Sequence, residues 1–351
     1  MALLWLDNFG YVIDSSSVTN GCDYLGSCYS QGGHSGQPAL YYPSSRNSEA
    51  GYLRFGYRAG FALHVTNCMG DYDSLVWGCA MLFDQTGYSS DMIQMRNASG
   101  AHITVSSTGN TLQVKDANGA NVGSSFSVPV NQWYYFEMKV TLGNSTGACE
   151  IRINGEQKVN FTNQDFLYSS GSAYIEKLEH YDSDSSMQFW MSEIYVTDGE
   201  FLGPIRVRAC YPDEDSATHT DFTPSSGSDH YAMVDETAYD DDSTYNTGSQ
   251  EEDKDTYLFD TSSVVGPVRG VSLMTRATRT GGSALKFKNM VRVGSTDYDG
   301  GREYYTDIGY DDFHQVWGVN PNTSSAWTTG EIASAEFGVH ITGLSTTTTT
   351  A

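Results

Sequence analysis

The sequence has few basic residues and few cysteines, and it contains no long apolar run. Of its 351 residues, 19 are Lys or Arg and 43 are Asp or Glu, which gives a formal net charge of −24. Proteins bind a phosphate backbone by neutralising it with Lys and Arg. We therefore expect no nucleic-acid partner, no DNA-packaging role and no place in the lumen of a capsid.

The apolar stretches are too short to span a bilayer, which takes roughly 18–20 consecutive residues. The apolar opening 1–6 ends at Asp7, and it has neither a basic flank nor a small-residue cleavage site. We therefore expect no membrane insertion and no secretory signal.

The six cysteines are too sparse for a disulfide scaffold, and no Cys-x-x-Cys pair suggests a zinc or redox site. Oxidation could close a loop between Cys22 and Cys28, or between Cys68 and Cys79. Free or buried thiols at all six positions, with Cys149 and Cys210 as the remaining two, are the alternative.

The composition predicts an all-β protein. Ser, Thr, Gly, Asn and Tyr dominate, and short alternating runs are separated by Gly, Asn and Asp. Such alternation buries one face of a strand and exposes the other. Asn-Gly at 118–119 and at 154–155 predicts hairpin turns, in which both central residues adopt positive φ. Representative predicted strands are 52–57, 102–106, 111–115 and 151–153.

Residues 324–337 carry a helical signal. Thr328 or Thr329 could serve as the N-cap, because an acidic residue follows two or three positions later. The window predicts one or two turns of helix. A surface turn that orders Trp327 and Phe337 is the alternative.

The length suggests about two domains. We predict a jelly-roll domain over 1–203, an acidic connection over 204–260, a second, smaller β-sandwich core over 261–343 and a Thr-rich tail over 344–351. Residues 211–260 hold 15 acids and one base, Lys254, and are interpreted as a solvated arm. Clustered carboxylates could also bind Ca²⁺, which prefers oxygen ligands, so calcium is the alternative to no cofactor.

No residue is nominated as catalytic, cofactor-binding or metal-binding. A polysaccharide hydrolase needs two carboxylates flanking one bond, whereas Glu176 and Glu179 would point to opposite faces of a strand. His219 and His230 stand among acids and are interpreted as members of surface ion pairs. Motifs of serine hydrolases, zinc proteases and phosphate loops do not occur in the sequence. We therefore expect a protein that is not an enzyme.

Aromatic residues are abundant, with 24 Tyr, 15 Phe and 6 Trp. Trp133, Tyr135 and Trp190 lie in strand patterns and are predicted core residues. Tyrosines in Gly-, Ser- and Asp-rich segments could contact a sugar ring or a protein partner. These are Tyr24, Tyr29, Tyr41, Tyr42, Tyr72 and Tyr88.

Two segments resemble a known fold family. Residues 133–140 and 149–155 look like the strand pair of laminin G and concanavalin A-like lectin domains. Those domains are antiparallel jelly-roll sandwiches. The resemblance implies a concanavalin A-like jelly roll over 1–203.

A second resemblance spans nearly the whole chain. It is carried by residues 192–199, 201–207, 222–228, 253–257, 316–321, 327–328 and 336–339. These segments look like a two-part virion protein found in tailed-bacteriophage genomes. Many relatives of that protein carry two consecutive Asp where this chain has Ser192-Glu193, so no metal site is carried over.

These resemblances imply a non-enzymatic virion structural protein on the particle exterior, in the tail, a fibre or the capsid decoration. The expected partners are other virion proteins and further copies of the chain, and the jelly roll could contact host-surface glycans. Such particles assemble in the host cytoplasm, so no signal peptide is needed. A free carbohydrate-binding module is the alternative, and a polysaccharide depolymerase is a weaker one.

Overall fold

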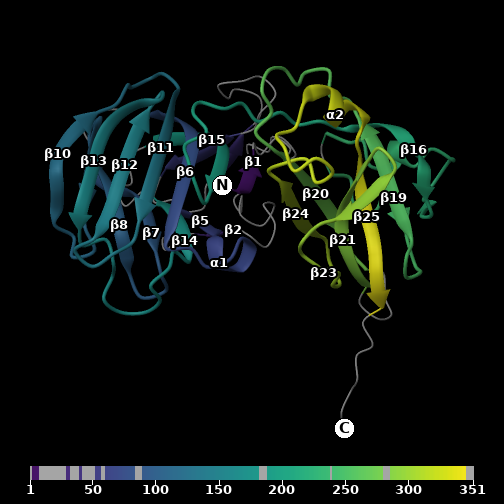
Figure 1. The fold of residues 1–351 in the computed structure, drawn as a ribbon, viewed down its shortest axis with the longest axis horizontal. Coiled ribbons are helices and arrows are strands. Elements are labelled where there is room, and N and C mark those ends of the chain that lie inside the picture. Colours follow the sequence, from purple (N-terminus) through teal and green to yellow (C-terminus); the bar gives the residue numbers. More distant parts are fainter. Residues whose placement is uncertain are drawn as a thin grey trace, which may run out of the picture. The chain divides into compact units, whose positions relative to one another are not determined.

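The computed structural model describes residues 2–7, 29–31, 39–41, 52–56, 60–83, 89–181, 188–237, 239–279 and 285–344. The chain divides into two compact units, Met1–Val207 (unit 1) and Arg208–Ala351 (unit 2) (Figure 1). Regular structure in both units is almost entirely antiparallel β-sheet, which confirms the predicted all-β class. Within the described ranges, no helix has the length and apolar character of a membrane span.

Unit 1 is the predicted jelly-roll sandwich of two antiparallel sheets. Strand order is β13-β12-β11-β6-β15-β4-β3 in the first sheet, where β1 also pairs with β15, and β10-β9-β8-β7-β14-β5-β2 in the second. The first sheet contains β1 (Leu3–Asp7), β3 (Ala39–Tyr41), β4 (Tyr52–Gly56), β6 (Ser74–Phe83), β11 (Tyr134–Thr141), β12 (Gly147–Ile153), β13 (Glu156–Gln164) and β15 (Gln188–Thr197). The second contains β2 (Tyr29–Gln31), β5 (Gly60–His64), β7 (Ser89–Arg96), β8 (Ala101–Thr108), β9 (Thr111–Lys115), β10 (Asn121–Ser127) and β14 (Lys177–Tyr181), and the short helix α1 (Val65–Cys68) follows β5.

The core of unit 1 lies between the two sheets. Trp77 and Phe136 from the first sheet pack in one buried cluster with Ile103 and Val105 from the second. Burial of each such side chain contributes about 1.5–3 kcal/mol. The predicted alternation holds in β9, but β8 is buried over six consecutive residues, 102–107, so the predicted solvent-exposed face of this strand is wrong.

The two predicted hairpins form, with different turns. Asn154 and Gly155 have φ values of 52° and 82° and join β12 to β13 as a two-residue turn. Between β9 and β10 the connection is longer, and only Gly119 adopts positive φ, at 80°. There the Asp116 carboxylate closes the turn by accepting the N–H groups of Asn118 and Ala120, each at 2.9 Å.

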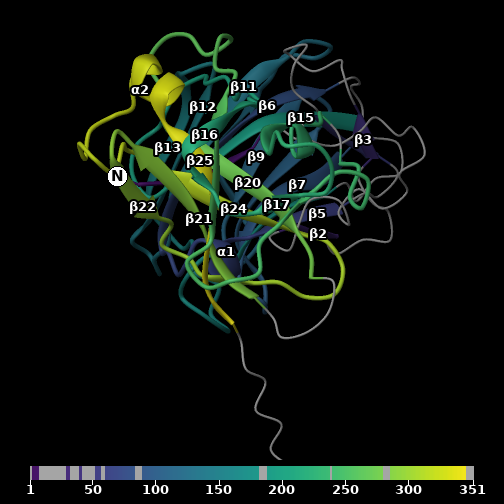
Figure 2. The same cartoon turned by 90° about the vertical axis from the view of Figure 1, so that its right-hand side faces the viewer.

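Unit 2 is a smaller sandwich. Its main sheet has the order β16-β19-β25-β21-β22, with β23 paired to β21, and the ribbon β20-β24 packs against it through Phe313 and Trp317. Figure 2 shows β21 and β25 side by side, with α2 at one end. The elements are β16 (Pro212–Thr220), β17 (Thr223–Pro224), the 3₁₀ turn η2 (Tyr231–Met233), β18 (Asn246–Thr247), β19 (Lys254–Phe259), β20 (Val271–Ala277), β21 (Leu285–Val293), β22 (Thr296–Asp299), β23 (Tyr304–Tyr305), β24 (Asp311–Trp317), α2 (Thr329–Ser334) and β25 (Glu336–Leu344).

The predicted acidic connection over 204–260 is wrong. Two of its segments, β16 and β19, are strands of the main sheet of unit 2, and Asp255 and Tyr257 are buried there. Asp255 can enter this sheet because the Tyr257 hydroxyl and the His230 ring hydrogen-bond its carboxylate. The chain divides after Val207 rather than after residue 203.

The structure also tests the predicted helix and one of the two possible disulfides. Thr328 is the N-cap of α2 in a capping box with Glu331, which confirms the helix prediction. Cys68 is disulfide-bonded whereas Cys79 is a free, buried thiol, so a Cys68–Cys79 bridge is wrong. Cys149 and Cys210 are also free. Cys22, Cys28 and the tail beyond Leu344 lie outside the described residues.

Candidate binding surface

A polar hollow of about 580 Å³ lies where three loops of unit 1 meet. We call it the rim hollow. The loops are the β9–β10 turn, the β11–β12 loop and the long β13–β14 connection. It is lined by Ala117, Asn118, Asn144, Asp165, Leu167, Tyr168, Ser169, Gly171, Ser172 and Ala173.

Two buried polar side chains hold the β13–β14 connection in place. Asn97 donates to the carbonyl oxygens of Ser170 and Ser172, and its own oxygen accepts the N–H groups of Ser99 and Gly100, all at 2.9 Å. Asn97 is fully buried, so these four bonds form away from water. The loop geometry therefore exists before any ligand arrives.

His102 on β8 provides the second anchor. Its Nδ1 accepts the N–H of Tyr168 at 3.0 Å, which leaves Nε2 to donate to the carbonyl of Tyr174 at 3.1 Å. Burial lowers the pKa of His102, in agreement with this neutral ring. The histidine thus bridges both ends of segment 168–174.

Glycines let the loop approach the sandwich. A Cβ on Gly100 would come within 2.5 Å of the Tyr168 ring, and a Cβ on Gly171 would come within 2.9 Å of the Asn97 amide nitrogen. Gly171 also has φ of 91°, a conformation that side chains rarely adopt. Both glycines are needed for Tyr168 and Asn97 to occupy their positions.

The lining chemistry suits a polyhydroxylated ligand. Asn118 donates to the Asp165 carboxylate at 3.2 Å, which places an amide and a carboxylate side by side at the mouth. A carboxylate accepts hydrogen bonds, whereas an amide both donates and accepts. Among the lining residues, all within the described ranges, Asp165 is the one that carries a charge.

A second hollow, of about 340 Å³, lies on β8, β9 and β10. We call it the hairpin hollow. Its lining is Ser106, Thr108, Thr111, Gln113, Lys115, Asn121 and Ser125. The single cation there, Lys115, is paired with Asp91 at 2.8 Å. Hydroxyl and amide groups therefore dominate this surface as well.

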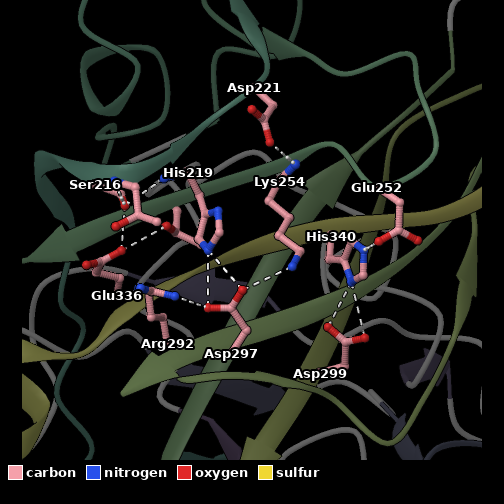
Figure 3. A network of polar contacts seen from close by, with 12 residues as sticks. Ser216, His219, Asp221, Glu252, Lys254, Arg292, Asp297, Asp299, Glu336 and His340 are labelled. Carbon is pink, nitrogen blue, oxygen red and sulfur yellow. Dashed lines mark hydrogen bonds and ion pairs between the residues drawn. The ribbon is translucent and has the colours of Figure 1, made fainter. Parts of the chain in front are cut away.

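Unit 2 carries a network of charges on its main sheet (Figure 3). Asp297 accepts hydrogen bonds from His219, Lys254 and Arg292. Burial raises the pKa of Asp297, but these three donors outweigh it and hold the pKa well below its ordinary value. Beside them His340 contacts Asp299 at 2.9 Å and Glu252 at 3.5 Å. The network ties β19, β21, β22 and β25 together.

Ser216, His219 and Asp297 are close but do not form a nucleophilic triad. The His219 ring contacts Asp297 through Nε2, while the Ser216 hydroxyl donates to Glu336 and accepts the backbone N–H of His219. A triad requires the ring to accept the serine proton. This arrangement stabilises the sheet.

The prediction of a surface ion pair is wrong for His230. This histidine is 8% exposed and its Nδ1 lies 3.0 Å from the fully buried Asp255. Tyr257 donates to the same carboxylate, at 2.6 Å. His219 is also largely covered, since its side chain is 13% exposed. Long-range packing, which the local sequence does not show, covers both histidines.

Several acids of the predicted arm accept hydrogen bonds from backbone N–H groups. Asp215 accepts the backbone N–H groups of His230 and Tyr231, and Asp253 accepts those of Ser249 and Gln250. In the described part of the chain, no group of three His, Cys, Asp or Glu side chains has an arrangement that could hold a metal ion.

Buried carboxylates of unit 1 are also engaged. Glu137 is fully buried, where it accepts the Tyr195 hydroxyl and, at 2.8 Å, the N–H of Gly203. The Glu176 carboxylate accepts a hydrogen bond from the Ser172 hydroxyl, and Glu179 pairs with Arg96 at 2.6 Å. None of these three forms an open carboxylate pair facing a cleft.

The predicted aromatic residues have mixed positions. Tyr135 is fully buried, as predicted, whereas Trp133 and Trp190 are half-buried. Tyr72 packs against the core of unit 1 rather than standing free. Tyr29 and Tyr41 lie in β2 and β3, with side chains outside the described set, as are Tyr24, Tyr42 and Tyr88 altogether.

The residues that shape the rim hollow are not among those predicted from the sequence. Asn118 lies in a predicted turn, and Asn97, His102 and Asp165 are not predicted site residues. A histidine inside the strand pattern 102–106 was the available signal, because a polar ring there needs a buried partner.

No protein-family model and no curated protein matches this sequence. Among solved structures, the chain is similar to the Trypanosoma cruzi calreticulin globular domain at 10% identity and a TM-score of 0.38, covering 57% of this chain and 89% of that one. The botulinum neurotoxin type G receptor-binding domain gives 10% identity and a TM-score of 0.32, with coverage of 83% and 75%. A sialidase gives 10% identity and a TM-score of 0.34, and the match spans 46% of this chain but only 17% of the sialidase. These TM-scores are low, so the fold assignment depends on the strand pairing within this chain and not on these similarities.

Proposed function

We propose that the chain is a non-enzymatic binding and structural protein whose unit 1 contacts a glycan at the rim hollow. The observation that carries this proposal is the anchoring of an exposed polar loop by buried Asn97 and His102. Preorganised loops bind with a smaller loss of conformational entropy. The virion exterior as its location rests on the sequence resemblance and on the strong negative charge.

A glycan array tests the binding role. The labelled full chain should bind a defined set of glycans, and Asn118→Ala and Asp165→Ala should each weaken the binding about tenfold, a loss of about 1.4 kcal/mol. Asn160→Ala, an exposed position on β13, is the matched control and should bind like the wild type. Absence of binding, or unchanged binding by both site variants, would contradict the proposal.

Light scattering with and without EDTA tests the structural role. A stable trimer or larger assembly would support repeated copies on a particle. Loss of that assembly in EDTA would support a calcium site in the acidic residues 211–260. A monomer unaffected by EDTA would favour the free carbohydrate-binding module over the virion subunit.

A further inference from the structure

The two hollows of unit 1 share one hairpin. Lys115 at the end of β9 lines the hairpin hollow, and Ala117 lines the rim hollow, so one residue separates them. Two residues of extended chain span at most about 7 Å. The Cα atoms of Lys115 and Ala117, one from each lining, therefore lie within about 7 Å of each other.

The chemistry of the two linings is continuous. Both linings contain hydroxyl and amide side chains, and each carries one charged side chain, Asp165 in the rim hollow and Lys115 in the hairpin hollow. Lys115 forms an ion pair with Asp91, and the Asp165 carboxylate accepts a hydrogen bond from the Asn118 side-chain amide. An acidic glycan would meet the Asp165 carboxylate, and no uncompensated cation among the lining residues would attract it.

We infer that the two hollows are successive subsites for an extended, uncharged oligosaccharide that lies along the β9–β10 hairpin. This inference rests on the proposed glycan contact and specifies its ligand. The rim hollow holds one end of the ligand through the amide and carboxylate pair. The hairpin hollow holds further sugar units through hydroxyl and amide groups.

The test is a titration of the full chain with neutral oligosaccharides of increasing length. The probes are maltose-, cellobiose- and mannobiose-based ladders up to the hexasaccharides, with hyaluronan fragments as the acidic arm. Affinity for one ladder should rise at least about tenfold from its shortest to its longest member. The hyaluronan fragments should bind at least about tenfold more weakly than that member.

Two variants separate the subsites. Ser125→Arg, which introduces a bulky side chain into the hairpin hollow, should weaken the longest ligand about tenfold and leave the shortest unchanged. Asp165→Ala should weaken both. Ser295→Arg, at an exposed turn of unit 2, is the control. Circular dichroism of each variant checks that it is folded.

The outcomes distinguish this inference from the proposed function. Affinity that is independent of length, an unaffected Ser125→Arg variant, or equal binding of hyaluronan would overturn the extended neutral site while glycan binding stands. If no ladder and no array glycan binds the wild type, the proposed function itself fails, and the inference fails with it.

Discussion

Asn97 shows how a single buried amide determines the surface geometry of unit 1. All four of its hydrogen bonds go to backbone groups, two of them on the segment that lines the rim hollow. Asn97 thus shapes the rim hollow through the loop that it positions.

Asn97→Ala should destabilise the protein by about 2–4 kcal/mol, because it leaves several buried backbone groups without a partner. Glycan binding should fall with it, since the 168–174 segment loses an anchor. Denaturant unfolding followed by circular dichroism measures the change. Asn160→Ala, exposed on β13, should stay within about 0.5 kcal/mol of the wild type. Equal stability of both variants would refute the anchoring role.

At the scale of elements, the pairing of β19 with β25 depends on a glycine. A Cβ at Gly338 would collide with the carbonyl oxygen of Asp255 and come within 2.7 Å of the Thr256 Cα. Backbone atoms cannot rotate away as a flexible side chain can. The strands approach this closely because one of them has no side chain there.

Gly338→Ala should therefore separate the central strands of unit 2 and cost about 3 kcal/mol or more. Gly343→Ala on the same strand is the control, because its Cβ would meet nothing closer than the Lys286 Cδ at 3.6 Å. Thermal unfolding and hydrogen exchange of unit 2 peptides provide the measurement. Similar losses in both variants would show that strand propensity, not the collision, is responsible.

The helix α2 depends on its first residue. The Thr328 hydroxyl accepts a hydrogen bond from the Glu331 N–H at 3.2 Å, and the Thr328 N–H donates one to the Glu331 carboxylate at 2.8 Å. Thr328→Ala should lower the free energy of unfolding by about 1 kcal/mol, and Thr328→Ser should retain most of it. Denaturant titration of the wild type, Thr328→Ala and Thr328→Ser measures these differences. Equal stability of all three proteins would contradict the role of the cap.

At the scale of the whole molecule, each unit has its own core and its own charge balance. The core cluster of unit 1 and the smaller clusters of unit 2 are built from separate parts of the chain. In unit 2, buried acids lie on both β19 and β24. Its stability should therefore depend on pH.

Burial raises the pKa of Asp255 and of Asp312 from 3.8 to about 6, although Tyr257 and His230 in the first case and Arg276 in the second oppose the change. At pH values between 3.8 and about 6, the folded unit therefore binds more protons than the unfolded chain. Its free energy of unfolding should thus fall as the pH rises from about 4 to about 6, by on the order of 2 kcal/mol for each group.

Hydrogen exchange of unit 2 peptides across this pH range measures the effect. Asp255→Asn and Asp312→Asn should each flatten the dependence, because the substituted amide does not titrate. A slope in both variants equal to that of the wild type would sink this assignment and leave the overall negative charge as its cause.

Local signals were sufficient for many elements. The Asn154-Gly155 turn requires positive φ, the β9 strand alternates with period two, and the Thr328 cap satisfies a helix end. Each of these depends on residues a few positions apart. They were predictable because the physical requirement lies within the same short segment.

Charge density alone could not predict that the acidic residues 211–260 belong to unit 2, because several of their partners come from elsewhere in the chain. Arg276, which lies beyond that block, pairs with Asp241 at 2.6 Å, and His340, also beyond it, lies 3.5 Å from Glu252. A count of charges along the sequence indicates only repulsion among the acids. The fold brings Arg276 and His340 next to them.

The sequence by itself determined the all-β class, the approximate division into two units and the principal turns, since periodicity and turn chemistry act over short range. Only the tertiary structure decided which polar residues matter at the candidate site. Asn97, His102 and Asp165 belong to three different segments, and their hydrogen bonds join residues up to 75 positions apart. Such a site is set by how the loops meet, which is a property of packing and not of local sequence.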